Sequence, residues 1–216
     1  MISINTNYGS LFASKSASAA QKTMNTAMER LSSGLRINNA KDDAAGQGIA
    51  VRLSAELMGL QMASRNASDA QSMIDTAESA HQEVHNMLLR MREIAVQAAN
   101  GTLSDADRTA LNAEVTALET EITSIADNTT FAGVKLGTST AVSFQIGPNN
   151  GVNLDHTFKD FSVTQISANV DVTSTGSAGA AISTINAAIS TVSTRRGELG
   201  ALSNRLSSVI ANLDNI

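Results

Sequence analysis

The segment 43–98 most constrains the fold, because apolar residues recur in it every three or four positions and no proline interrupts them. This spacing places them on one face of a helix. A continuous helix of this extent would be roughly 80 Å long at about 1.5 Å per residue, which predicts a coiled-coil rod. Asn100 and Gly101 should end it, with glycine supplying the left-handed turn. The recurring residues are Ile49, Leu53, Leu57, Leu60, Ala67, Ala70, Ile74, Ala77, Val84, Leu88, Met91, Ile94 and Ala98.

A separate apolar stripe predicts an earlier helix at about 11–35. Polar and glycine residues at 32–34 and 38–39 interrupt the pattern, so we expect a joint there. Asp42 or Asp43 can then accept hydrogen bonds from the free amides that begin the next helix. We therefore predict an N-terminal helical segment at 1–42 and a helical rod domain at 43–216. The stripe consists of Ala17, Ala20, Met24, Ala27 or Met28, Leu31 and Leu35.

Two further helices complete the predicted rod. The sequence Ser-Asp-Ala-Asp at 104–107 starts one of them, which should close at 128–130. The turn before it is tight, so this helix should run antiparallel to the helix at 43–98. The segment 171–179 is predicted to be a connection, and the last helix covers about 180–213.

Between the helix that closes at 128–130 and the last helix, apolar residues recur at every second position. Val142, Phe144 and Ile146 alternate with polar residues, a turn cluster follows at 147–151, and Val152 resumes the alternation. This pattern predicts a β-hairpin within a region of about 131–172 and leaves open an extension through Phe158, Phe161 and Val163. The predicted fold is mainly α, an elongated antiparallel helical coiled-coil rod with a small β-hairpin region.

The amino-acid composition excludes several classes of function. The chain has no cysteine, which excludes disulfides and thiolate chemistry. Its formal net charge of −5 argues against a nucleic-acid partner. No apolar run is long enough to span a membrane, so we expect no membrane insertion. The first residues lack the basic start and apolar stretch of a secretory signal peptide, so secretion would need another route.

The sequence offers only weak evidence for catalytic residues. His81 and His85 are four residues apart and could reach one metal ion on a helix. However, Glu83 lies two positions after His81, where a zincin helix has its glutamate directly after the first histidine. We interpret the two histidines as solvated polar positions and the pair Asp42 and Asp43 as helix caps. The sequence therefore predicts no enzyme, no catalytic residue, no metal and no cofactor.

The helix at 11–35 has no evident partner in the chain. An isolated helix of this length with an unburied apolar stripe is only marginally stable in water. Its partner must be another subunit, a chaperone, or a segment not present here. This favours an assembly protein over a self-contained domain.

Several motifs of the sequence together resemble those of a known family. RLSSGLRIN at 30–38, followed by AKDDAAG at 40–46, resembles the N-terminal signature of bacterial flagellins. The opening residues 4–7, MREIAVQAANGT at 91–102 and NTTFAGVKL at 128–136 fit the same family. RRGELGA at 195–201 and NRL at 204–206 resemble the start of its C-terminal conserved half.

The resemblance implies a secreted structural subunit that polymerises into the flagellar filament for motility. Its implied partners are copies of itself, the flagellar export apparatus, and the filament cap and junction proteins. Leu11, Met24, Leu31 and Leu35 become candidates for packing in the filament core. The family normally continues past Ile216 with a further terminal helix, so the resemblance also implies a truncated, polymerisation-impaired chain.

A second implied role is recognition by an innate immune Toll-like receptor. The positions that match the receptor-contacting surface of the family are Arg90, Glu93 and Glu114, while Leu89 and Ile94 lie where the family varies. The alternative is that Arg90 only pairs with Glu93 or another acidic residue of the rod.

Two other identities remain alternatives. A hook-filament junction protein resembles flagellin in its ends, but the signature at 30–46 favours flagellin. A non-flagellar coiled-coil adaptor is less consistent with the predicted hairpin and with the lack of a membrane anchor.

Overall fold

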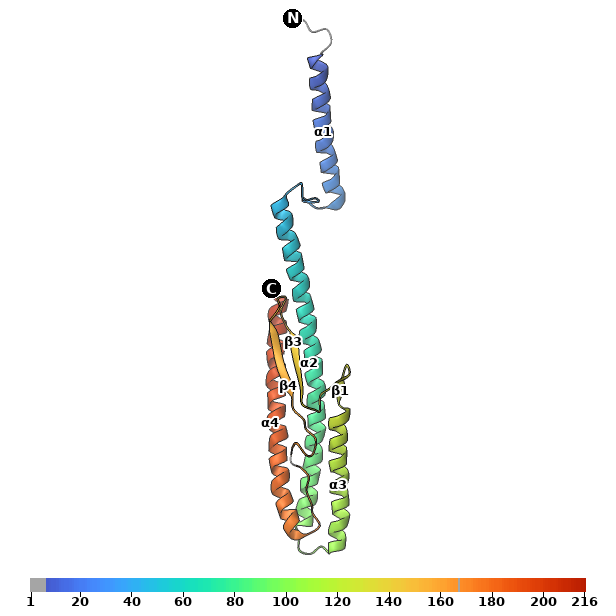
Figure 1. Cartoon of the computed structure of the whole chain (residues 1–216), viewed down its shortest axis with the longest axis vertical. Helices are drawn as coiled ribbons and strands as arrows, with labels where there is room; N and C mark the ends of the chain where they lie inside the picture. Colours follow the sequence, from blue (N-terminus) through green and yellow to red (C-terminus); the bar gives the residue numbers. More distant parts are fainter. Residues whose placement is uncertain (1–6, 167) are drawn as a thin grey trace. The chain divides into compact units, whose positions relative to one another are not determined.

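The structure is a computed structural model that describes residues 7–166 and 168–216 (Figure 1). Within these residues it contains four α-helices and four β-strands. The chain divides into two compact units, Met1–Leu57 and Met58–Ile216. This division lies inside the second helix, later than the domain boundary at residue 42, which stays a prediction.

The first unit contains helix α1, Tyr8–Ser33. The Asn7 side chain accepts a hydrogen bond from the Ser10 amide at 3.2 Å and so caps the first turn. Gly34 ends the helix with φ of 70°, and its amide donates to the Arg30 carbonyl. Because this left-handed conformation costs little only for glycine, Gly34 provides the joint that the sequence predicts after this helix.

Both aspartates after the joint accept backbone hydrogen bonds. The Asp42 carboxylate accepts from the amides of Asn38 and Asn39 at 3.3 and 3.1 Å and so holds the turn. The Asp43 carboxylate accepts from the Gly46 amide at 2.8 Å, within the first turn of the next helix. The capping interpretation is confirmed for Asp43, whereas Asp42 stabilises the turn before the helix and caps no helix start.

Helix α2 is continuous over Ala44–Ala98, 55 residues, as the periodicity predicts. Its buried residues begin only at Ala63. The part that precedes Met58 belongs to the first unit, and its large apolar residues are exposed. The same periodic stripe is thus covered along one part of the helix and uncovered along the other.

The second unit is built around the remainder of α2. Helix α3, Asp105–Asn128, runs antiparallel to α2, as predicted, and helix α4, Thr175–Asp214, also runs antiparallel to α2 (Figure 1). Ser104 and Asp107 form a capping box at the start of α3, and Ser174 and Ser177 form one at the start of α4. The second box starts α4 within the segment 171–179 that the sequence assigns to a connection.

The predicted hairpin is confirmed as strands β3, Thr140–Gln145, and β4, Asn153–Phe158. They pair antiparallel with Phe144 opposite Leu154. A smaller pair that the sequence did not predict, β1 at Thr130–Phe131 and β2 at Val134–Lys135, precedes them. Phe161 and Val163 are buried but lie outside the strands, so the open extension reaches only Phe158.

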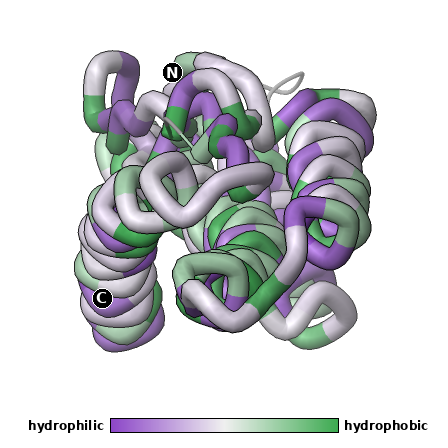
Figure 2. Tube along the Cα trace, turned by 90° about the horizontal axis from the view of Figure 1, so that it is seen from below, coloured by the Kyte–Doolittle hydropathy of each residue, from purple (hydrophilic) through white to green (hydrophobic). Residues whose placement is uncertain are grey.

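Two apolar clusters form the core of the second unit. One joins α2, α3 and α4 with the segment 161–172, and the other joins α2 and α4 with the hairpin through Leu154 and Phe158. Hydrophobic and hydrophilic residues are interleaved along the helices (Figure 2), as amphipathic elements require. Alanines on α2 provide much of this core and allow the neighbouring elements to approach closely.

Candidate functional site

The first candidate surface is formed by the exposed side chains of Leu11, Met24 and Leu31 on α1 and of Leu35, which lies beyond the helix end at Ser33 and not within the helix as predicted; we call this surface the apolar face of α1. These side chains are 60%, 48%, 86% and 60% exposed, and no residue of α1 is buried. Further large apolar residues are exposed in the same unit, and an accumulation of exposed apolar side chains indicates an interaction surface. They are Tyr8, Phe12, Met28, Ile49, Val51, Leu53 and Leu57.

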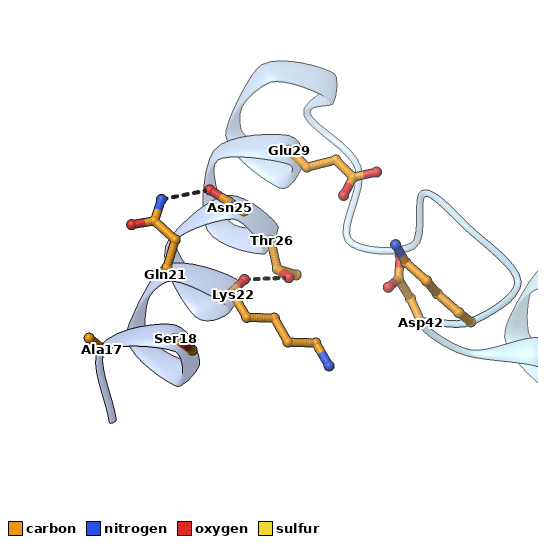
Figure 3. A pocket seen from close by; sticks show the side chains of 9 residues that line it. Ala17, Ser18, Gln21, Lys22, Asn25, Thr26, Glu29 and Asp42 are labelled. Carbon is orange, nitrogen blue, oxygen red and sulfur yellow. Dashed lines mark hydrogen bonds between the residues drawn. The ribbon is translucent and has the colours of Figure 1, made fainter. Parts of the chain in front are cut away.

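A polar groove lies beside this face, between α1 and the segment that leads to α2 (Figure 3). Lys22 and Glu29 line it from α1, and Lys41 and Asp42 line it from the opposite side. Gln21 donates to Asn25 at 3.2 Å along its α1 wall. The groove mixes both signs of charge with amides, which suits a polar protein surface better than an anion or a metal.

The second candidate surface is an exposed ion-pair cluster of Arg90, Glu93 and Glu114 in the second unit. Arg90 Nη2 lies 2.8 Å and Nε 2.9 Å from the same oxygen of Glu114 on α3. Its Nη1 lies 3.1 Å from Glu93, one turn further along α2. The hydrogen bonds that Arg90 donates to Glu114, and to a lesser extent to Glu93, raise the pKa of Arg90. The guanidinium is therefore held in one orientation at the surface.

This arrangement brings together all three residues that the sequence selected. It also contains the ion pairs that the alternative interpretation expects, so the geometry is compatible with both. Leu89, the neighbour of Arg90, is 43% exposed and adds an apolar contact beside the charged cluster. Whether a receptor binds there stays a prediction.

The histidine interpretation needs a correction. His81 is not a solvated position, because it is 3% exposed and lies in the core between α2, α4 and the segment after β4. His81 follows Ile74 and precedes Leu88 by seven residues each, so its place on the buried stripe was readable from the spacing. In the described part of the chain, no three His, Asp or Glu residues are grouped so as to hold a metal ion.

Arg108 is a buried residue that sequence reasoning missed. It donates to the carbonyls of Ala98 and Asn100, each at 3.0 Å, and to Asp105 at 3.0 Å. It thereby satisfies carbonyl groups that the end of α2 leaves without helical partners. Its position seven residues before the buried Val115 was the available signal.

Two further findings bear on function. Arg196 on α4 and Glu78 on α2 form an ion pair at 2.7 Å that joins the two helices. None of the helices in residues 7–166 and 168–216 combines the length and apolar character that a membrane span requires.

Comparison with known proteins decides the family. Residues 4–139 match the family described as the bacterial flagellin N-terminal helical region. A flagellin of Halalkalibacterium halodurans is 44% identical over 194 residues, which cover 88% of this chain and 71% of that protein. The chain belongs to the bacterial flagellin family. A flagellin of Salmonella muenchen is 48% identical over 160 residues, which cover 74% of this chain.

Solved structures agree with this membership. The crystal structure of Bacillus cereus flagellin superposes with a TM-score of 0.64 at 29% identity, covering 69% of this chain and 88% of that one. A flagellar hook-associated protein of Vibrio parahaemolyticus has a TM-score of 0.69 at 17% identity and covers 82% of this chain and 95% of that chain, which supports the shared fold. The chain spans 34% of the length of the Pseudomonas aeruginosa B-type flagellin and 32% of the length of the Salmonella muenchen flagellin.

Proposed function

We propose that the chain is a structural subunit that polymerises into the bacterial flagellar filament and serves motility outside the cell. Family membership supports this role, and the exposed apolar face of α1 is the observation that carries it. The role needs no reaction, so the absence of an enzyme activity stays the expectation. The export apparatus and the filament cap and junction proteins are the partners that this role implies.

The energetics favour burial of the α1 face on assembly. Covering one large apolar side chain is worth about 1.5–3 kcal/mol, so several together can offset the lost freedom of an associating subunit. No residue of α1 is buried in the free chain, and the helix is stabilised by its own hydrogen bonds and caps and by one hydrogen bond that Asn39 donates to Glu29 at 2.8 Å. A second copy, or a further helical segment as the family resemblance implies, would supply the missing contacts.

Charges on the α1 face are expected to prevent assembly. In the double variant L31D/L35D, each association would bury two carboxylates, so we expect the dissociation constant of self-association to rise at least about a hundredfold. Sedimentation over a range of concentrations measures the constant, and electron microscopy shows whether filaments form. The matched control S18D/N25D adds the same charge to the polar groove and should assemble like the unchanged chain.

Two results would contradict this role. One is self-association of L31D/L35D with the same dissociation constant as that of the unchanged chain. The other is an unchanged chain that stays monomeric at every concentration while the amides of α1 resist hydrogen exchange, because α1 would then already be covered by its own chain.

We further propose that the Arg90, Glu93 and Glu114 cluster is recognised by an innate immune Toll-like receptor. The supporting observation is an exposed guanidinium whose orientation is fixed by two carboxylates, beside the exposed Leu89. A planar group with several donors that is already held in place loses little conformational freedom on binding.

Arg90→Ala is expected to lower receptor activation by about tenfold or more in a reporter-cell assay, because it removes the donors and releases both carboxylates. The bundle should stay folded, since exposed ion pairs contribute only about 0–1 kcal/mol. Arg92→Ala is the matched control: it removes an exposed arginine of α2 that contacts Asn186 instead of the cluster. Equal responses from the two variants would remove the proposal.

A further inference from the structure

A buried imidazole in the second unit has no role in the functions proposed above. His81 projects from α2 into a small recess, where its ring lies 4.4 Å from the ring of Phe161 with an interplanar angle of 55°. The recess is closed by α4 and by the end of β4 with the residues after it. Its lining includes His156, Phe158, Lys159, Arg195, Glu198 and Leu199.

The hydrogen bonds of His81 define its protonation state. Nδ1 lies 2.8 Å from the carbonyl oxygen of Ala77. A carbonyl oxygen can only accept, so Nδ1 must carry the hydrogen. Nε2 is buried and has no partner within the described residues. The neutral ring protonated at Nδ1 is therefore the form compatible with this environment, because its unprotonated Nε2 carries no hydrogen that would need an acceptor.

Adding a second proton to the His81 ring would be energetically unfavourable. It would create a buried N–H donor at Nε2 with no acceptor, and a buried charge without a partner is costly. The facing carboxylates are engaged, since Glu78 pairs with Arg196 at 2.7 Å and Glu198 pairs with Lys159 at 2.9 Å. The titratable and charged residues around the ring are Glu78 and His85 on α2, Arg195, Arg196 and Glu198 on α4, and His156, Lys159 and Asp160 at the end of β4 and after it.

We propose that His81 is an acid-sensitive lock in this bundle: the neutral imidazole completes the packing between α2, α4 and the Phe161 segment, and its protonation opens that packing. The lock belongs to the second unit and does not depend on polymerisation or on a receptor. Its consequence is a second unit whose stability falls as the pH drops below about 6.5, the ordinary histidine value.

The direction of the pH effect follows from linkage. Burial is the largest cause that lowers the pKa of His81, and Arg195 and Arg196 lower it further, against the raising effects of the Ala77 hydrogen bond and Glu78. The unfolded chain, with an ordinary histidine pKa of about 6.5, therefore takes up the proton first as the pH falls. Stability is complete above about pH 6.5, decreases as the pH falls toward the folded-state pKa, and levels off below it.

Long-range ¹H–¹⁵N spectra of the histidine-labelled full chain test the lock directly. At pH 7.5 we expect His81 to show the neutral form protonated at Nδ1. Its titration midpoint should lie below that of the same residue in the urea-unfolded chain. A ring protonated at Nε2, or a midpoint equal to or above the unfolded one, would overturn the proposal without any variant.

His81→Leu provides the second test, because leucine is apolar and cannot titrate. Between pH 7.5 and pH 5.5 the folding equilibrium constant of the unchanged chain should fall up to about tenfold more than that of His81→Leu, since one pH unit below 6.5 changes the constant by at most one decade. Urea unfolding at each pH gives the constants. Titrating groups common to both chains, including His156 and Glu119, cancel in this comparison.

His85→Leu is the comparison variant, because it removes a second imidazole of α2, one turn further along, whose Nδ1 is also buried without a partner in the described residues. If the effect belongs to His81, His85→Leu should lose less of the pH dependence than His81→Leu does. An equal loss of pH dependence in both variants, or none in His81→Leu, would remove the assignment to His81. If His81→Leu does not fold, the titration midpoint in the unchanged chain decides alone.

Discussion

Replacing Leu88 with alanine is expected to lower the free energy of unfolding of the bundle by about 2–5 kcal/mol. Leu88 is completely buried on α2 and packs in the cluster that joins α2, α3 and α4. The substitution removes three side-chain carbon atoms and leaves a cavity that three helices cannot easily close. Urea unfolding followed by far-UV circular dichroism measures the change.

The adjacent residue provides the control for this substitution. Leu89 lies on the same helix but is 43% exposed, so Leu89→Ala loses less burial and leaves no closed cavity. We expect its cost to stay below about 1 kcal/mol, as for surface substitutions in general. Similar losses for both variants would mean that the observed packing of α2 is wrong.

Gly137→Ala is expected to destabilise the second unit by about 3 kcal/mol or more. A Cβ atom at this position would lie 2.5 Å from the carbonyl carbon of Ala126 and even closer to its oxygen. The obstacle is the backbone of α3 near its end, which cannot rotate away as a side chain could. The segment after β2 would have to move, together with the hydrogen bond from the Phe161 amide to the Gly137 carbonyl.

Gly197→Ala should change stability in the opposite direction. Gly197 lies inside α4, and a Cβ atom there would meet nothing within 4 Å. Alanine in a helix interior is favoured over glycine by about 0.5–1 kcal/mol, so we expect a gain of that size in the same urea experiment. Equal losses at the two glycines would show that the close approach at Gly137 is not what matters.

The helices and the hairpin could be predicted because their signals are local. The capping residues Asp43 and Ser104 and the joint near Gly34 stand within a few residues of the ends that they define. The start of α4 was placed too late, because the serines at 174 and 177 read as a polar connection although they form a capping box. The short pair β1 and β2 was missed because two-residue strands have no period to detect.

The candidate site was predictable only in part. Arg90, Glu93 and Glu114 were selected through family resemblance, and the structure shows that a residue of α3 meets two residues of α2 at one point. His81 and Arg108 were overlooked because polar residue types were taken as exposed, although both stand on the apolar period of their helices. Their burial depends on partners far along the chain: Phe161 for His81, and the end of α2 for Arg108.

The sequence by itself determined where each helix lies, which face of it is apolar, and to which family the chain is related, because periodicity and capping act over a few neighbouring residues. Only the tertiary structure decided which stretch of the apolar stripe is covered. It buries α2 from Ala63 onward and leaves the α1 face uncovered. An apolar helix face is buried only when another surface packs against it. The amphipathic pattern of the helix is the same whether that other surface belongs to the same chain or to another molecule.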